Sequence, residues 1–142
     1  MSSLSPLVLH SLNSPAETVV LKLNQLLNDL NLQLFCIINH SQEAQKSGLE
    51  LPFEQLFIFG DPKTGTFLMQ ENPYIGLELP LKILIWQDSQ NRAQIAYKNP
   101  LFLAQEYGIK QHIEILQKMR DALDFLIEKM SDPKHDKEKD NG

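Results

Sequence analysis

Five short apolar runs, separated by polar, glycine- or proline-containing segments, divide the chain into candidate strands. Each run is rich in aliphatic, β-branched or aromatic residues, which is typical of β-strands. The runs occupy residues 7–12, 32–39, 53–59, 81–87 and 92–98. The second run, LQLFCIIN, is apolar at most positions, so we predict that it lies in the centre of a sheet. A polar turn joins the last two runs and predicts a hairpin.

Two longer segments repeat their apolar residues with the spacing of an amphipathic helix. They cover residues 15–30 and 109–130, approximately. Ser14 is placed to cap the first of these helices, because its hydroxyl can accept a hydrogen bond from the first helical turn. A shorter helix is predicted to begin after Asn99 and to stop at Gly108.

The order strand, helix, four strands, helix predicts an α+β fold. Its sheet is expected to be mainly antiparallel and covered by helices on one face, because the last three strands follow one another without long crossovers. A single domain is predicted over residues 1–130. Residues 131–142 contain no large apolar side chain, so we predict a disordered charged tail that is dispensable for folding.

Three segments carry a resemblance to a known family: LFIFGDPKTGTFLMQ at 56–70, LELPLKILIWQD at 77–88 and YKNPLFLAQEYGI at 97–109. In their order and spacing they resemble the domain-of-unknown-function family 302, over about residues 7–109. The resemblance implies a fold similar to the TATA-box-binding-protein-like group, a homodimer, and no established activity. Asn39 stands where members often carry Asp, and Tyr107 where they often carry His, which weakens the case for metal or hydrolytic chemistry.

Charge and composition narrow the classes of function. The net charge is -5 and the basic residues are scattered, which argues against a nucleic-acid partner. A single cysteine, Cys36, excludes an internal disulfide and zinc sites of the paired-cysteine type, and it fits a cytoplasmic location. No apolar run approaches the roughly 20 residues of a membrane span. We therefore expect no membrane, metal or cofactor, and we find no catalytic signature that would decide whether the chain is an enzyme.

The glycine- and proline-marked stretch at 60–70 is the candidate ligand site. Its backbone N–H groups could hold a small polar or anionic ligand, with Gly65 allowing close approach, Lys63 adding charge and Met69 forming an apolar wall. His40 would join them at one rim of the sheet if the strands at 32–39 and 53–59 are parallel neighbours. The candidate ligand-binding residues are His40, Lys63, Thr64, Gly65, Thr66 and Met69.

We favour a structural interpretation of the same stretch over a ligand site. In it Asp61 caps a helix, Pro62 fixes φ and Gly65 provides a positive φ, with no ligand involved. Two functional hypotheses follow. The first is a small binding module with its site at the 60–70 loop. The alternative is a protein-interaction or assembly module that acts through a homodimer surface.

Overall fold

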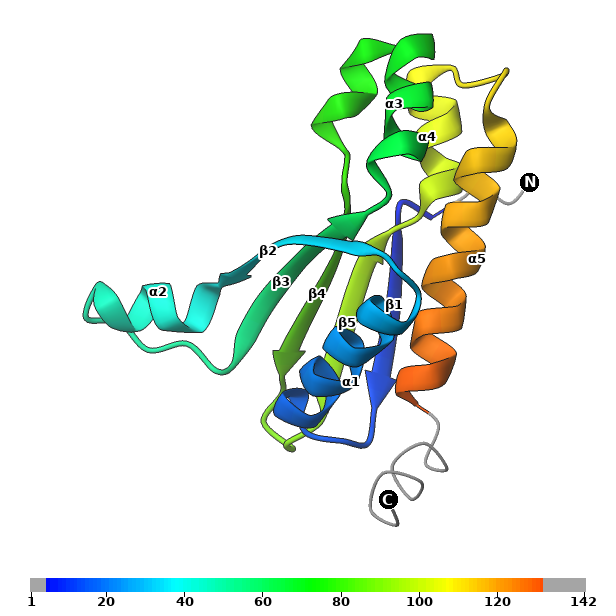
Figure 1. Ribbon diagram of the computed structural model, residues 1–142. Coiled ribbons are helices and arrows are strands. Elements are labelled where there is room, and N and C mark those ends of the chain that lie inside the picture. Colours follow the sequence, from blue (N-terminus) through cyan, green and yellow to red (C-terminus); the bar gives the residue numbers. More distant parts are fainter. Residues whose placement is uncertain (1–4, 132–142) are drawn as a thin grey trace.

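The computed structural model describes residues 5–131 and shows one sheet with its helices (Figure 1). The elements in chain order are β1 (Leu7–Leu12), α1 (Ala16–Asp29), β2 (Gln33–Asn39), α2 (His40–Lys46), β3 (Glu54–Gly60), α3 (Pro62–Glu71), the 3-10 turn η1 (Pro73–Leu77), β4 (Leu81–Gln87), β5 (Ala93–Lys98), α4 (Pro100–Tyr107) and α5 (Ile113–Met130). The predicted tail lies, apart from Ser131, outside the described residues.

The strands form a five-stranded sheet in the order β1-β5-β4-β3-β2, and every neighbouring pair is antiparallel. The predicted α+β class and the β4–β5 hairpin are confirmed. One expectation is wrong: β2 was predicted to be central, but it lies at an edge of the sheet. Its apolar sequence does not reflect burial, since six of its seven residues are exposed.

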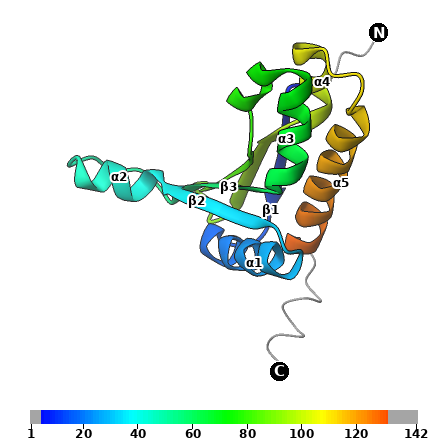
Figure 2. The ribbon, with the colours of Figure 1, turned by 45° about the horizontal axis from the view of Figure 1, so that its top comes forward.

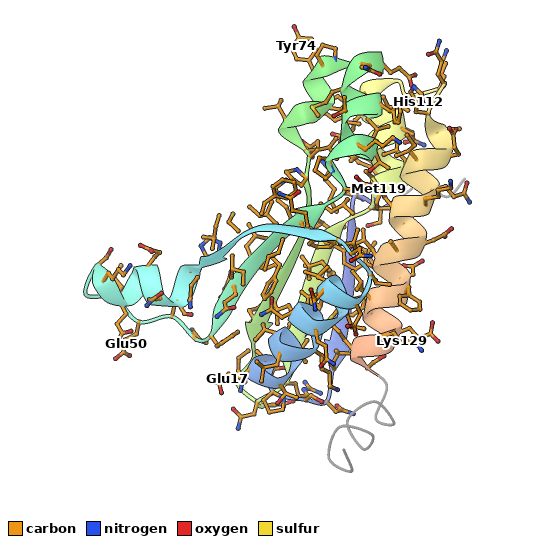
Figure 3. All side chains as sticks on the ribbon, in the orientation of Figure 1. Glu17, Glu50, Tyr74, His112, Met119 and Lys129 are labelled. Atoms are coloured by element: carbon orange, nitrogen blue, oxygen red, sulfur yellow. The ribbon has the colours of Figure 1, made fainter. Side chains whose placement is uncertain are left out.

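The main hydrophobic core lies between the sheet and two helices, α1 and α5, on one face (Figure 3). Alternate side chains of β3 and β4 point into this core, as expected for strands with one buried face. They are Phe57, Phe59, Ile83 and Ile85, all fully buried. We call this set, with the α1 and α5 residues that pack on it, the main cluster.

A second, smaller apolar cluster lies above the end of the sheet, where α3, η1 and α4 meet the first half of α5 (Figure 1). Its buried members are Leu68, Ile75, Leu103, Ile109 and Leu116. We call it the upper cluster. Because the two clusters have no buried member in common, the domain has two separately packed regions that are joined through α5.

The chain from β2 through α2 extends away from the body of the domain (Figure 2). We call residues 33–53 the arm. None of the residues of α2 is buried. The side chains of Leu34, Phe35, Ile37 and Ile38 in β2 are each between 37% and 42% exposed. The arm therefore presents apolar surface that the described part of the chain does not cover.

Side-chain caps position the helices around the loop at 60–70. The carboxylate of Asp61 accepts the N–H of Lys63 at 3.0 Å, as predicted from the sequence. Gly108 ends α4 in the left-handed region with φ 61°. The prediction that the Ser14 side chain caps α1 is wrong. The N–H of Ala16 instead donates to Oε1 of Gln87 at 2.7 Å, so the start of α1 is tied to β4.

The start of α5 is closed by a carboxylate from another helix. Glu71, the last residue of α3, accepts backbone N–H groups from Lys110 at 2.6 Å, Gln111 at 3.1 Å and His112 at 3.0 Å. These hydrogen bonds, the one from Lys110 first, hold the pKa of Glu71 below its usual 4.5. Glu71 therefore joins the end of α3 to α5 across the upper cluster.

This carboxylate gives an expected acid dependence of stability. Because the folded state lowers the pKa of Glu71, its contribution is present above the unfolded pKa and is lost as pH falls through the folded pKa. When the pH is lowered from neutral to acid, the free energy of unfolding measured by urea denaturation should therefore fall less for Glu71→Gln than for the wild type. Glu114→Gln, at an exposed acid in the first turn of α5, is the control: it removes a carboxylate but keeps the hydrogen bonds of Glu71, so it should retain the acid dependence that these bonds cause.

Candidate functional site

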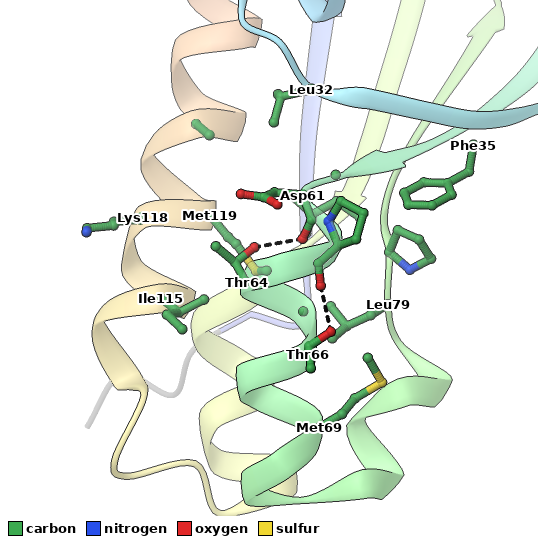
Figure 4. A pocket seen from close by; sticks show the side chains of 16 residues that line it. Leu32, Phe35, Asp61, Thr64, Thr66, Met69, Leu79, Ile115, Lys118 and Met119 are labelled. Carbon is green, nitrogen blue, oxygen red and sulfur yellow. Dashed lines mark hydrogen bonds between the residues drawn. The ribbon is translucent and has the colours of Figure 1, made fainter.

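A pocket of about 480 Å³ lies where α3 faces α5, below the start of β2 (Figure 4). Four separate segments form its walls: the start of β2, the loop and helix at 60–69, the stretch at 79–81 and the middle of α5. Most of the lining is apolar. These side chains are Leu32, Phe35, Pro62, Met69, Leu79, Pro80, Leu81, Ile115, Met119 and Ala122.

The pocket lies at the boundary between the two clusters. Leu32 and Leu81 of its lining pack against the main cluster. Leu79, Ile115 and Met119 pack against the upper cluster. The space therefore remains where two separately packed regions meet along one side of α5.

The pocket has few polar groups, and its two threonine hydroxyls already donate hydrogen bonds to backbone carbonyl oxygens. The hydroxyl of Thr64 donates to the carbonyl oxygen of Asp61 at 3.0 Å, and that of Thr66 to the carbonyl oxygen of Pro62 at 2.8 Å. Lys118 is part of the lining, but its side chain points away from the space in Figure 4. The site thus offers mainly apolar contact, with the carboxylate of Asp61 and two threonine hydroxyls beside it.

The structure brings four of the six predicted ligand-binding residues together. Thr64, Gly65, Thr66 and Met69 all line the pocket. Lys63 is exposed and is not part of the lining.

The prediction that His40 lies beside this loop is wrong. A shared rim required parallel strands, but β2 and β3 are antiparallel, with Gln33 opposite Gly60 and Asn39 opposite Gln55. His40 therefore begins α2 on the arm, at the end of β3 away from the pocket.

Gly65 differs from its predicted role, because it lies inside α3 rather than in a turn with positive φ. Its N–H donates to the carbonyl oxygen of Asp61 at 3.2 Å, as in a regular helix. A Cβ at this position would meet Leu79 Cδ1 at 3.7 Å and Met69 Cε at 4.0 Å, which are ordinary van der Waals distances. The missing side chain therefore leaves room at the pocket and is not demanded by the backbone.

Gly65→Ala is accordingly expected to stabilise the protein by about 0.5–1 kcal/mol, because glycine inside a helix is less favourable than alanine by that amount. Thermal or urea denaturation measures the change. A suitable contrast is Gly108→Ala, which should destabilise because Gly108 has φ 61°. A loss of stability in Gly65→Ala would show that the helix is not regular at this position.

The other walls of the pocket were not predicted. Ile115, Met119 and Ala122 follow one another at helical spacing in α5, but only Met119 belongs to the apolar stripe predicted for that segment. The stripe does not tell which of its members are packed and which line a space. Leu32 and Phe35 carried no signal other than their apolar character.

A network of hydrogen bonds and ion pairs joins the segment after η1 to β5 and α4. Glu78 accepts from Lys98 Nζ at 2.6 Å and from the Tyr107 hydroxyl at 3.1 Å, and Lys98 also pairs with Glu106 at 2.9 Å. The hydrogen bond from Lys98 lowers the pKa of the Glu78 carboxyl. Tyr107, which stands where the resembling family often carries His, thus serves here as a donor that joins α4 to the segment after η1.

A second polar chain lies between β1, β5 and α5. The Tyr97 hydroxyl donates to Asp124 Oδ1 at 3.2 Å, and His10 Nε2 lies 3.3 Å from the Tyr97 hydroxyl oxygen. Burial, followed by the charge of Asp124, raises the pKa of Tyr97 to about 12. Within residues 5–131, no three His, Cys, Asp or Glu side chains are grouped in a way that could hold a metal ion.

The antiparallel sheet, the helices on its face and the apolar pocket together define a small α+β domain. The chain belongs to the family described as "Domain of unknown function DUF302", whose model matches residues 9–126. The crystal structure of an uncharacterized conserved DUF302 protein from Bacillus stearothermophilus is similar, with a TM-score of 0.78, 15% identity, and coverage of 89% of this chain and 99% of that one. This likeness shows a shared fold.

Proteins named fluoride-specific ion channels also match part of the chain. FluC 1 of Brucella suis biovar 1 (strain 1330) is 34% identical over 100 residues, which are 70% of this chain and 38% of that protein. FluC 2 of Brucella melitensis biotype 1 (strain ATCC 23456 / CCUG 17765 / NCTC 10094 / 16M) is 34% identical over 100 residues, or 36% of its length. The chain thus spans less than half of these curated relatives. No helix within residues 5–131 has both the length and the apolar character needed to cross a membrane.

Proposed function

We propose that this chain is a small-molecule-binding module whose ligand occupies the pocket between α3 and α5. The observation that carries the proposal is the apolar space of about 480 Å³, which falls within the roughly 300–1,000 Å³ of ordinary ligand sites. Such sites combine a mostly apolar wall with a few polar groups, and Asp61, Thr64 and Thr66 supply those here.

The chemistry of the lining favours an apolar or amphipathic ligand over the polar or anionic one expected from the sequence. Lys63 is not part of the lining and Lys118 points away from it. The carboxylate of Asp61 is part of the lining and would repel an anion. A neutral or cationic molecule with an apolar body of moderate size satisfies both the wall and this carboxylate.

The partial match to the Brucella proteins supports an accessory role. In those proteins the matching region is 36–38% of a longer chain, so the family domain there accompanies other sequence. We propose that the domain senses or holds a small molecule on behalf of a partner protein or domain. A cytoplasmic location, which the single free cysteine Cys36 favours, is part of this proposal.

Filling the pocket tests the proposal. Ala122 lines the space from α5, so Ala122→Phe should occupy part of it. We expect the neutral apolar dye N-phenyl-1-naphthylamine to bind the wild type saturably, and Ala122→Phe to weaken this binding at least tenfold. Gln117→Phe adds the same side chain to an exposed position of α5 outside the lining, and should leave dye binding unchanged.

Equal dye affinity in the two phenylalanine variants would contradict the proposal, because the dye would then bind elsewhere. Circular dichroism and a melting curve establish that each variant is folded. If Ala122→Phe does not fold, Ala122→Leu fills less of the space and should weaken dye binding in the same direction. Native mass spectrometry of the purified wild type adds a direct search for a bound small molecule.

A second candidate function is an assembly module that works as a homodimer. The specific observation in its favour is the arm, where α2 buries none of its residues and the apolar side chains of β2 remain exposed. Exposed apolar surface of this kind is typical of an interaction site. Light scattering tests this candidate directly, since a mass near the 16.3 kDa of one chain at micromolar concentration would contradict it.

A further inference from the structure

The polar side chains at the pocket between α3 and α5 offer hydrogen-bond acceptors to a ligand rather than donors. The hydroxyl of Thr64 gives its proton to the carbonyl oxygen of Asp61, and that of Thr66 gives its proton to the carbonyl oxygen of Pro62. Each hydroxyl oxygen keeps a lone pair that can accept a further bond. Lys118 carries the only ammonium group of the lining, and it points away from the space (Figure 4). A ligand that bonds to these side chains must therefore donate.

The carboxylate of Asp61 has one oxygen to spare for such a donor. Its Oδ1 accepts the N–H of Lys63 at 3.0 Å, and its Oδ2 has no hydrogen-bond or ion-pair partner within residues 5–131. Because Asp61 is part of the lining, a ligand can use Oδ2 while Oδ1 continues to cap α3. Hydrogen bonds from a charged donor to a carboxylate are roughly twice as strong as bonds between neutral groups. The best match to this oxygen is a cation with N–H groups.

The start of α3 does not turn this end of the pocket into an anion site. The N-terminus of a helix carries the positive end of its dipole and in general attracts anions. Here the carboxylate of Asp61 already occupies that position, and Pro62, at the start of the helix, has no N–H to donate. An anionic head group would have to approach beside a like charge.

The rest of the pocket suits an elongated apolar body. From Asp61 to Met69 the chain of α3 rises by roughly 12 Å, at about 1.5 Å per residue. Between these two residues Gly65 leaves room at the wall, where an added Cβ would lie 3.7 Å from Leu79 Cδ1. Met119 adds a flexible thioether from α5. The polar end and the apolar wall therefore follow one another along a single helix.

We propose that the ligand of this pocket is a protonated primary amine on an apolar chain or ring. Its ammonium group donates to Oδ2 of Asp61, with the hydroxyl oxygen of Thr64 as a further acceptor, and its apolar body lies along α3 toward Met69. The inference rests on the small-molecule-binding function proposed above and names the chemical class of the ligand. Fatty acids and phosphate esters, whose head groups are anionic acceptors, do not fit this polar end.

Four probes with the same alkyl chain test the head group. Octylamine is a charged donor, octanol a neutral donor and octanoate a charged acceptor, while trimethyloctylammonium keeps the positive charge but has no N–H. Isothermal titration calorimetry at neutral pH gives the affinity of the wild type for each. We expect octylamine to bind about tenfold more tightly than octanol or trimethyloctylammonium, and octanoate to bind most weakly. Ala122→Phe should weaken octylamine binding, as it should weaken dye binding.

Asp61→Asn removes the charge and keeps the helix cap. Asparagine caps a helix about as well as aspartate and retains an oxygen for the N–H of Lys63, but its second polar atom is a donor. We expect octylamine to lose affinity by about tenfold and octanol by less than about threefold. Asp121→Asn makes the same change at an exposed position of α5 outside the lining, and should leave the affinity for octylamine nearly unchanged.

Salt dependence provides a measurement on the wild type that does not depend on the folding of a variant. Added sodium chloride screens the attraction between an ammonium group and a carboxylate. The affinity for octylamine should therefore fall relative to that for octanol as the salt concentration rises. A ratio of the two affinities that stays constant with salt would overturn the inference, whether or not Asp61→Asn folds.

The outcomes separate the ligand class from the pocket itself. Equal binding of octylamine and octanol, or of octylamine to the wild type and Asp61→Asn, overturns the amine and leaves the pocket standing if Ala122→Phe still weakens dye binding. Tightest binding of octanoate, with a loss in Lys118→Met, assigns the polar end to an anion and overturns the inference in the same way. Trimethyloctylammonium binding as tightly as octylamine overturns the N–H donation. If neither the dye nor any octyl probe binds, the proposed function fails as well.

Discussion

Phe57→Ala is expected to destabilise the domain by about 3–5 kcal/mol, the usual cost of removing a buried aromatic ring. Phe57 is 0% exposed and lies in β3, between Ile37 of β2 and Ile83 of β4. Its ring is part of the main cluster beneath α1 and α5, so the truncation leaves a cavity that neighbouring side chains fill only in part. A loss of this size is a large part of the roughly 5–15 kcal/mol that stabilises an ordinary domain.

Phe125→Ala provides the matched control, because it removes the same ring from α5 at a site that is 39% exposed. The Nζ of Lys129 lies 5.5 Å from the ring centroid of Phe125. We expect a cost below about 1 kcal/mol, since part of the ring is already in water and alanine favours the helix. Urea denaturation of both variants gives the comparison. Similar losses would mean that Phe57 does not lie in the main cluster.

The second large effect is expected at Asn99, which is only 4% exposed and caps α4. Its side-chain oxygen accepts the N–H of Leu101 at 3.1 Å, and its Nδ2 donates to the carbonyl oxygen of Ser5 at 3.4 Å. Asn99→Ala removes both bonds and leaves part-buried backbone groups without a partner. We expect a loss of about 1–3 kcal/mol in the free energy of unfolding.

Asn99→Asp separates the two hydrogen bonds. The aspartate retains an oxygen for the N–H of Leu101 but has no N–H for the carbonyl oxygen of Ser5. Its loss of stability should therefore be smaller than that of Asn99→Ala. If the two variants lose the same amount, the cap at Leu101 contributes little and the contact with Ser5 accounts for the effect.

Local features of the fold could be predicted because their causes lie within a few residues. The caps at Asp61 and Asn99, the stop at Gly108 and the strand boundaries all depend on nearby backbone groups. The position of β2 could not be predicted in this way. An apolar strand is typical of the centre of a sheet, but strand order depends on which distant segments pair.

The candidate site was predictable only in its local part. The glycine and proline residues marked the 60–70 stretch, and four residues of that stretch do line the pocket. The opposite walls come from β2 and α5, which are brought near by tertiary packing. The orientation of β2 relative to β3 also decided that His40 lies far from the pocket, and no feature near His40 in the sequence reports that orientation.

The division of the apolar side chains into two clusters has a consequence for the exchange of amide hydrogens with solvent. Because α3 and η1 pack in the upper cluster, they can open while the main cluster keeps the sheet intact. A molecule held in the pocket touches both clusters, so opening of α3 would require its release. Its binding would therefore slow exchange in α3 by the factor 1 + [L]/Kd, where [L] is the free ligand concentration, and leave the slowest amides of β3 and β4 less affected. Exchange rates in α3 would then measure occupancy of the pocket even for a ligand without colour or fluorescence.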